Sequence, residues 1–179
     1  MNLNRYSKRK YPKLLTEQEK DAIFTYTEDH FEINNCLRFN RSMRTNIEEK
    51  VQFLDLALSK FQLDNSLIVY RNINMIIDDF FDEYIDAITS GSFTDLGYTS
   101  CTTIRNLYAK VANIKLQILL EPCVNGAYIK YLSSFREENE FLLARGTTFE
   151  TLDYSVDNGV HKVMCKVQNK KRTIPSSRF

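Results

Sequence analysis

The chain has 179 residues, of which 43% are hydrophobic and 26% are charged, and its formal net charge at pH 7 is +1. Twelve Phe and ten Tyr residues exclude an intrinsically disordered chain. The near-neutral charge argues against nucleic acid or an anionic membrane as the partner of the whole domain. We therefore expect a single folded domain over residues 1–179.

Both ends of the chain are basic, and we interpret them as solvated tails. The cations concerned are Arg5, Lys8, Arg9, Lys10, Lys13, Lys162, Lys166, Lys170, Lys171 and Arg172. No stretch approaches the roughly 18 consecutive apolar residues of a membrane span. Four widely spaced cysteines and two isolated histidines form no metal-ligand or redox motif. We therefore expect reduced thiols and no bound metal.

The first half of the sequence has the periodicity of helices. Thr16 and Glu19 have the spacing of a capping box, which predicts that a helix begins there. Asn46 predicts a second helix start, because apolar residues then recur every three or four positions. These residues are Ile47, Val51, Leu54, Leu58 and Phe61.

A strand and a further helix are predicted next. The β-branched run from Leu67 to Ile73 favours a strand, and helical spacing returns from Ile76 to Ile88, before Gly91. Beyond Gly91 the spacing shortens to that of strands, in the runs GYTSCTT, IKLQILLE, GAYIKYL, ENEFLLA, TTFETLDY and VHKVMCKVQN. Helices followed by closely spaced strands predict an α+β fold with largely antiparallel sheets.

The stretch FREENEFLLARGTTF contains two carboxylates, Glu138 and Glu140, immediately before an apolar run. If this stretch is a strand, both carboxylates point to the same face. Two like charges held side by side repel each other, so the pair requires a cationic partner or a chemical role. Taken alone, the pair is better explained as a solvated strand edge.

Three elements follow one another along the chain in a recognisable order. They are Arg71 at the end of a predicted strand, Ser100 in an aromatic-x-Ser-x-Thr stretch, and Glu138-x-Glu140. This order resembles the Arg, Ser-Thr-Ser and Glu-x-Glu signature of mono-ADP-ribosyltransferase toxins. Residues 16–38, 54–73, 92–102 and 126–149 are also similar in pattern to that family, most closely to the enzymatic component of binary actin-modifying toxins.

The resemblance implies N-terminal helices packed on two mainly antiparallel sheets, and an enzyme that transfers ADP-ribose from NAD to a protein. Glu140 would stabilise the positive charge that develops on the ribose, Ser100 would hold Glu140, and Arg71 would bind the phosphates of NAD. Glu138 would take a proton from the acceptor, which points to arginine as the modified residue. Phe135 would contact the target protein.

Further NAD contacts are implied for Tyr26, Phe31, Asn35 and Asn72. Arg105 and Tyr108 are candidates for a loop that covers the nicotinamide and phosphate. The middle motif departs from the family pattern, because Ser100 is followed by Cys101 and Thr102. Taken alone, the two helix aromatics are equally explained as core residues, and Asn35 as a helix cap.

Actin is the first candidate for the target protein. A protein of this family is expected to be secreted or injected and to act in the host cytosol, with a delivery component as an open partner. Two alternatives remain. The protein is an NAD glycohydrolase, in which water takes the place of the acceptor, or it is a catalytically inactive member that binds a partner through the same surface.

Overall fold

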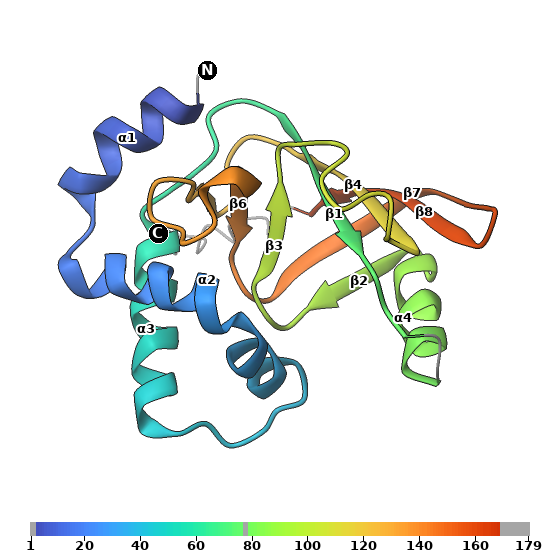
Figure 1. Cartoon of the computed structure of the whole chain (residues 1–179), viewed down its shortest axis with the longest axis horizontal. Helices are drawn as coiled ribbons and strands as arrows, with labels where there is room; N and C mark the ends of the chain where they lie inside the picture. Colours follow the sequence, from blue (N-terminus) through green and yellow to red (C-terminus); the bar gives the residue numbers. More distant parts are fainter. Residues whose placement is uncertain (1–2, 77–78, 169–179) are drawn as a thin grey trace, which may run out of the picture.

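The computed structural model describes residues 3–76 and 79–168. In the described chain three helices come first, and all eight strands follow them (Figure 1). In chain order the elements are α1 (Leu3–Leu14), α2 (Glu17–Arg38), α3 (Thr45–Ser59), β1 (Leu67–Ile73), α4 (Asp79–Thr89), β2 (Ser92–Asp95), β3 (Thr99–Thr102), β4 (Ile114–Leu120), β5 (Gly126–Tyr128), the 3-10 helix η1 (Arg136–Glu138), β6 (Glu140–Leu143), β7 (Thr147–Asp157) and β8 (Val160–Val167).

Helix α2 begins with the predicted capping box. The N–H of Glu19 donates to Thr16 Oγ1 at 3.3 Å, and the N–H of Thr16 donates to Glu19 Oε2 at 2.7 Å. Helix α3 begins one residue before the predicted Asn46, and its apolar stripe is buried. The helix predicted from Ile76 is α4, which begins at Asp79. Ile77, part of that predicted helix, lies outside the described residues.

The strands form one hydrogen-bonded sheet of eight in the order β2-β7-β8-β4-β1-β3-β6-β5. Within the described residues, every strand pair is antiparallel except β4 with β8, as the mainly antiparallel prediction requires. The expectation of two separate sheets is corrected. The strands β3, β6 and β5 are joined to the remaining five strands through β1. In the described residues this junction has one registered pair, Tyr70 of β1 with Thr102 of β3, so the sheet is continuous.

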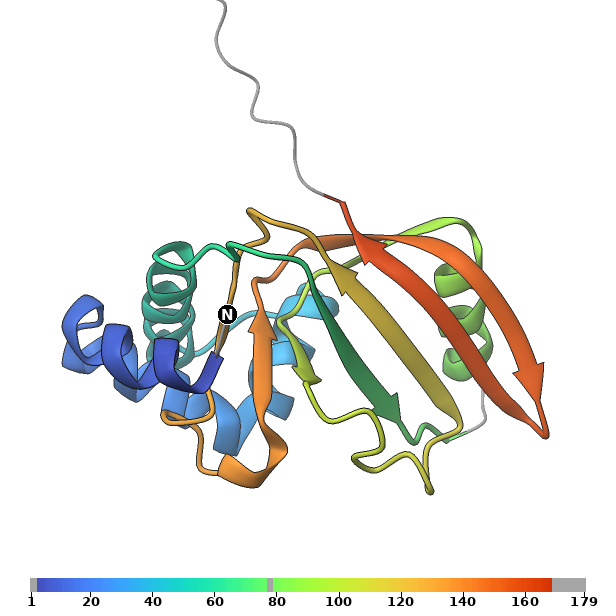
Figure 2. The ribbon, with the colours of Figure 1, turned by 90° about the horizontal axis from the view of Figure 1, so that it is seen from above.

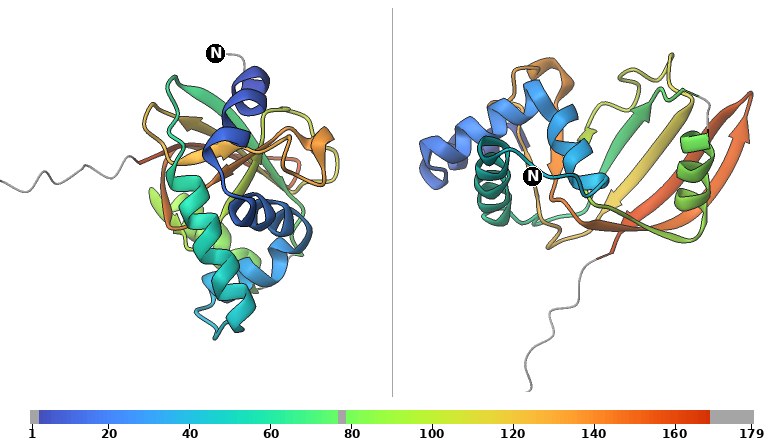
Figure 3. Two further views of the ribbon diagram at one scale, coloured as in Figure 1. Left: turned by 90° about the vertical axis from the view of Figure 1, so that its left-hand side faces the viewer. Right: turned by 90° about the horizontal axis from the view of Figure 1, so that it is seen from below.

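The helices cover the two ends of this sheet. Helices α1, α2 and α3 lie beside β5 and β6, whereas α4 lies at the end formed by β2, β7 and β8 (Figure 2). The right-hand view of Figure 3 shows the same separation. Phe141 and Leu142 of β6 belong to different buried clusters, because successive side chains of a strand point to opposite faces. This explains why the run before Ala144 is apolar without interruption.

The basic N-terminus is a helix and not the solvated tail that its charge suggested. In α1, Tyr11 is buried and its ring centroid lies 4.3 Å from that of Phe61. The cations Lys8, Arg9, Lys10 and Lys13 of the same helix are exposed. Leu15, just after the helix, is also buried, and Leu3 packs against the core, so this segment belongs to the fold despite its many charges.

The C-terminal cations are divided between a strand and the end of the chain. Lys162 and Lys166 lie in β8, where they form ion pairs with Asp157 at 2.6 Å and Glu150 at 3.2 Å. These two residues are therefore part of the sheet and not of a tail. The remaining cations predicted for the tail, Lys170, Lys171 and Arg172, lie outside the described residues.

Candidate active site

A cleft of about 610 Å³ lies between α2, the strands β1 and β3, and the turn before β6. Residues predicted for the site from separate parts of the sequence line it together: Tyr26, Phe31, Asn35, Arg71, Asn72, Ser100, Tyr108, Phe135, Glu138 and Glu140. Arg105 is the exception within the described chain, because it is exposed on the loop after β3 and does not line the cleft.

Glu140 is an acid of this cleft whose pKa is far from its ordinary value. It is the first residue of β6, lies opposite Thr102 in β3, and is only 4% exposed. Burial is the main reason why the pKa of Glu140 is raised to about 7. A hydrogen bond with Ser100 opposes this effect, and the charges of Glu138 and Arg71 act in opposite directions. The cleft therefore holds a carboxylate in a position from which most water is excluded.

Glu138 does not lie in the strand, so the prediction that both carboxylates share one strand face was wrong. Glu138 ends the 3-10 helix η1, and the next residue, Asn139, has a left-handed φ of 48°. The hydroxyl of Thr102 donates to the carbonyl of Glu138 at 2.6 Å and holds the turn against β3. Both carboxylates still reach the same cleft, but Glu138 does so from a turn.

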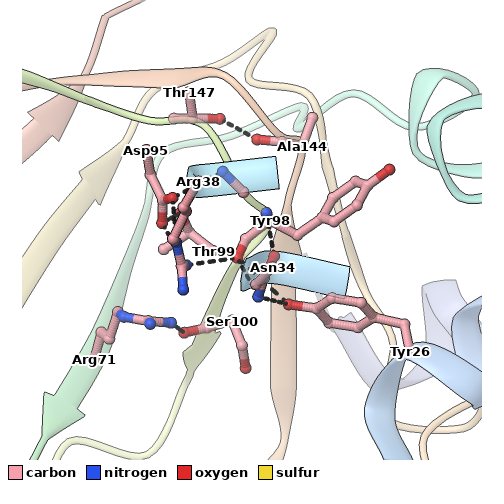
Figure 4. Close-up of polar contacts among 11 residues, drawn as sticks. Tyr26, Asn34, Arg38, Arg71, Asp95, Tyr98, Thr99, Ser100, Ala144 and Thr147 are labelled. Atoms are coloured by element: carbon pink, nitrogen blue, oxygen red, sulfur yellow. Dashed lines mark hydrogen bonds and ion pairs between the residues drawn. The ribbon is translucent and has the colours of Figure 1, made fainter. Parts of the chain in front are cut away.

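Arg71 is the cation that accompanies the two acids. It projects from β1, and its Nη1 donates to the carbonyl of Ser100 at 2.7 Å (Figure 4). A guanidinium has five N–H donors, so this bond leaves others for an anionic ligand. The bond also fixes the side chain of Arg71 beside the strand that carries Ser100.

Asn34, which the sequence analysis missed, connects α2 to the start of β3. Its Oδ1 accepts the N–H of Tyr98 at 2.8 Å, and its Nδ2 donates to the hydroxyl of Tyr26 at 3.0 Å (Figure 4). Tyr26 is 1% exposed, so it supports the wall of the cleft mainly from within the core. Its neighbour Asn35 was the predicted amide, and it lines the cleft beside this network.

Arg38, in the last turn of α2, is a second arginine of the cleft that was not predicted. Its Nε and Nη2 donate to the two oxygens of Asp95 at 2.8 Å each (Figure 4). Burial alone would raise the pKa of Asp95, but the hydrogen bonds and charge of Arg38 hold it below its ordinary value. Arg38 is therefore fixed beside Arg71, and both side chains line the cleft.

Two aromatic side chains stand at the rim of the cleft. Phe31 is 73% exposed and Phe135 is 43% exposed. The turn that carries Phe135 is tied to α2, because the N–H of Ser134 donates to Thr27 Oγ1 at 3.1 Å. The attachment lies just before Asp29, where α2 is kinked. This hydrogen bond therefore connects the turn that carries Phe135 to the helix that carries Phe31.

Asn72 and Tyr108 organise the loop between β3 and β4. The Nδ2 of Asn72 donates to the carbonyl of Leu107 at 2.7 Å. Tyr108 has a φ of 56°, and its hydroxyl donates to Glu138 Oε1 at 2.8 Å. The loop therefore crosses the mouth of the cleft, and one oxygen of Glu138 already has a donor.

Comparison with known proteins assigns the chain to a family. A family model described as ADP-ribosyltransferase exoenzyme matches residues 3–174. The chain belongs to this family. It is 31% identical over 150 residues to the NAD(+)–arginine ADP-ribosyltransferase EFV of Enterococcus faecalis, an alignment that covers 75% of this chain and 28% of that protein. The chain thus spans little more than a quarter of that relative.

Solved structures of ADP-ribosyltransferases share the fold. The C3 exoenzyme of Clostridium limosum superposes with a TM-score of 0.79 at 19% identity, over 93% of each chain. The C3stau2 protein of S. aureus, solved with NAD, gives a TM-score of 0.71 at 24% identity, over 87% of this chain and 88% of that one. The fold class and the family that the sequence predicted are therefore confirmed.

The middle motif of this ADP-ribosyltransferase uses its three side chains differently. Ser100 faces Glu140, and Thr102 holds the Glu138 turn. Cys101 is buried in the core, and burial raises the pKa of its thiol to about 12. The thiol therefore stays protonated, and the two hydroxyls on either side of it supply the polar contacts.

The described residues offer neither a cluster of metal ligands nor a helix that could span a membrane. No group of three or more His, Cys, Asp or Glu side chains is placed to hold a metal ion in the part of the chain that the structure describes. Within the same residues, the structure contains no helix with the length and apolar character needed to cross a bilayer.

Proposed function

We propose that this ADP-ribosyltransferase transfers ADP-ribose from NAD to an arginine side chain of a target protein and releases nicotinamide. The observation that supports this most directly is the arrangement of the two acids. Glu140 is buried beside Ser100 and Arg71, whereas Glu138 stands in a turn at the cleft mouth. The buried position of Glu140 suits a role at the bond between nicotinamide and ribose, which breaks. The position of Glu138 at the mouth suits a role toward the incoming acceptor.

The residues of the cleft fit NAD as the donor. NAD has two phosphates, and two guanidinium groups, those of Arg38 and Arg71, line the same cleft. Arginine is well suited to phosphate because its planar fork can make two parallel hydrogen bonds. Phe31 at the rim and Asn35 beside it are proposed to contact the rest of the molecule, as is Asn72 next to Arg71.

Glu140 is proposed to stabilise the positive charge that develops on the ribose when nicotinamide departs. Nicotinamide leaves neutral because its ring nitrogen was already positive, so no general acid is required. A fixed negative charge acts most strongly where water is excluded, and Glu140 is 4% exposed. Ser100 would keep the carboxyl aligned with the ribose. Glycoside hydrolases place a carboxylate near a similar cation.

Glu138 is proposed to activate the acceptor. A guanidinium has a pKa above about 12 and cannot attack while it is protonated, so a neighbouring carboxylate must accept or share its proton. Glu138 lies beside Phe135, which is exposed and available to a protein surface. Where the family carries glutamine at the first position of Glu-x-Glu, the acceptor is usually not arginine. The arginine specificity in the name of the Enterococcus relative agrees with Glu138.

The identity of the target is a finer part of the proposal. Actin is the first candidate, on the resemblance of residues 16–38 and of Phe135-x-x-Glu138-x-Glu140 to the binary toxins. Action in the host cytosol after secretion or injection, with or without a delivery component, follows from the same resemblance. Incubation with labelled NAD and host-cell extract, followed by mass spectrometry, tests target and residue together. Label on an arginine supports the proposal, and label on another residue type contradicts it.

Two other functions are separated by simple measurements. An NAD glycohydrolase would release nicotinamide in the extract without labelling any protein. An inactive binding module would release no nicotinamide at all. Neither is favoured by the site, because Arg71, Ser100 and Glu140 lie together and Glu138 would have no role in hydrolysis alone.

A further inference from the structure

The side chain of Asn139, the residue between the two acids, makes three hydrogen bonds. Its Oδ1 accepts hydrogen bonds from Tyr128 Oη at 2.8 Å and from Lys130 Nζ at 2.6 Å. Its Nδ2 donates to the carbonyl of Glu137 at 3.3 Å. The side-chain oxygen therefore has two donors, one of them charged, and charge-assisted hydrogen bonds are the stronger kind.

The backbone of Asn139 is fixed as well. Its carbonyl accepts the N–H of Thr103 at 3.2 Å and the hydroxyl of Thr103 at 3.4 Å. Its left-handed φ of 48° is a conformation that Asn tolerates better than most residues. Tyr128, Lys130 and Thr103 together form what we call the Asn139 clamp. It joins the turn to the end of β5 on one side and to the end of β3 on the other.

We propose that the Asn139 clamp positions Glu138 for the acceptor and thereby sets the ratio of transfer to hydrolysis. Glu140 does not depend on the clamp in the same way. It is paired in β6 with Thr102, and its carbonyl accepts the N–H of Ile129 at 2.9 Å. Glu138 lies outside that ladder, so the direction of its side chain depends on the turn and on the hydrogen bond from Tyr108. The inference rests on the proposed role of Glu138.

The amide chemistry of Asn139 suits this position. An aspartate would also accept from Tyr128 and Lys130, but it would add a third negative charge between Glu138 and Glu140. Like charges so close together would repel one another and destabilise the turn. Asparagine accepts the same hydrogen bonds without that charge. The positive charge of Lys130 lies against this turn, through its hydrogen bond to Asn139 Oδ1.

The test compares Asn139→Ala and Asn139→Gly with Asn158→Ala. Asn158 is a matched control because it also has a left-handed φ, of 51°, but lies in the turn between β7 and β8. Nicotinamide release is measured without acceptor, and transfer is measured with agmatine, a small guanidine. Transfer should fall about tenfold or more in both Asn139 variants, because misplacing a catalytic group by about 1 Å costs up to about 100-fold. Hydrolysis without acceptor should fall far less.

The glycine variant separates the clamp from backbone strain. Glycine adopts a positive φ freely, so Asn139→Gly keeps the turn conformation and removes only the side-chain contacts. Wild-type transfer in Asn139→Gly, or an equal loss in Asn158→Ala, would overturn the inference. Lys130→Met should lower transfer in the same way, and Lys130→Arg should recover most of it. Equal transfer by these two variants would contradict the role of the charged donor.

A second readout is independent of the acceptor. Hydrogen exchange of the Thr103 amide, which donates to Asn139, should be faster in both Asn139 variants and unchanged in Asn158→Ala. If the wild-type protein modifies neither agmatine nor an arginine of a protein in host-cell extract, the arginine proposal fails, and this exchange decides whether the clamp exists. Unchanged exchange in the Asn139 variants would rule the clamp out.

Discussion

Replacing Glu140 with Gln should make the protein more stable at alkaline pH while it abolishes activity. The Glu140 side chain is 4% exposed, and burial raises its pKa from 4.5 to about 7. An acid whose pKa is raised by folding contributes stability below its unfolded pKa, and this contribution is lost as the pH rises through the folded value. The shift corresponds to about 3 kcal/mol, because one pKa unit is worth about 1.4 kcal/mol.

Urea unfolding of both proteins between about pH 4.5 and about pH 8.5 measures this effect directly. Gln has nearly the shape of the protonated acid, so the two free energies of unfolding should be similar at the acidic end. Above about pH 7 the variant should be more stable, by up to about 3 kcal/mol. A difference that does not change with pH would refute the reasoning, because it would mean that Glu140 ionises as easily in the folded protein as in the unfolded chain.

The same pKa predicts the pH dependence of the wild-type enzyme. The value of kcat/KM reports groups of the free enzyme, and ionised Glu140 is the proposed active form. Nicotinamide release at low NAD concentration should therefore fall about tenfold per pH unit below about pH 7. A profile that stays flat down to about pH 5 would contradict the assignment of the raised pKa to a required carboxylate.

Three further substitutions test other parts of the site. Arg71→Lys should weaken NAD binding about tenfold by calorimetry, since lysine cannot form the planar fork; unchanged affinity would exclude Arg71 as a phosphate ligand. Tyr108→Phe should lower the KM for agmatine about threefold, because it frees Glu138 Oε1; a higher KM would mean that Tyr108 assists the acceptor. Gly126→Ala should destabilise the protein by about 1–3 kcal/mol in urea, because the added Cβ would lie 2.8 Å from the carbonyl oxygen of Leu142; an unchanged midpoint would contradict the close packing of β5.

The fold was predictable where a pattern extended over many residues. The capping box at Thr16, the apolar stripe of α3 and the run that forms β1 each appear in the structure within a residue of the prediction. Strand β2, Ser92–Asp95, was missed because it has four residues, lies at the edge of the sheet beside β7 and alternates between partly buried and exposed positions. The continuity of the sheet was also not predictable, because it depends on the one pair that joins β1 to β3.

Residues that line the cleft were predicted from the order of motifs, whereas their geometry could be known only from the fold. Periodicity placed Glu138 in a strand, but a left-handed Asn139 turns the chain there. Asn34 was missed because its role depends on Tyr98, 64 positions away in the sequence. Arg38 has no sequence signal of its own, since its role depends on Asp95, 57 positions away.

The division of labour between the two acids is the central claim, and one experiment measures it. Wild type, Glu138→Gln and Glu140→Gln are incubated with labelled NAD, with and without agmatine, and both free nicotinamide and labelled agmatine are quantified. Glu138→Gln should still release nicotinamide but lose transfer by about 10²–10⁴-fold, whereas Glu140→Gln should lose both reactions. Nicotinamide release at the wild-type rate by Glu140→Gln would contradict the account.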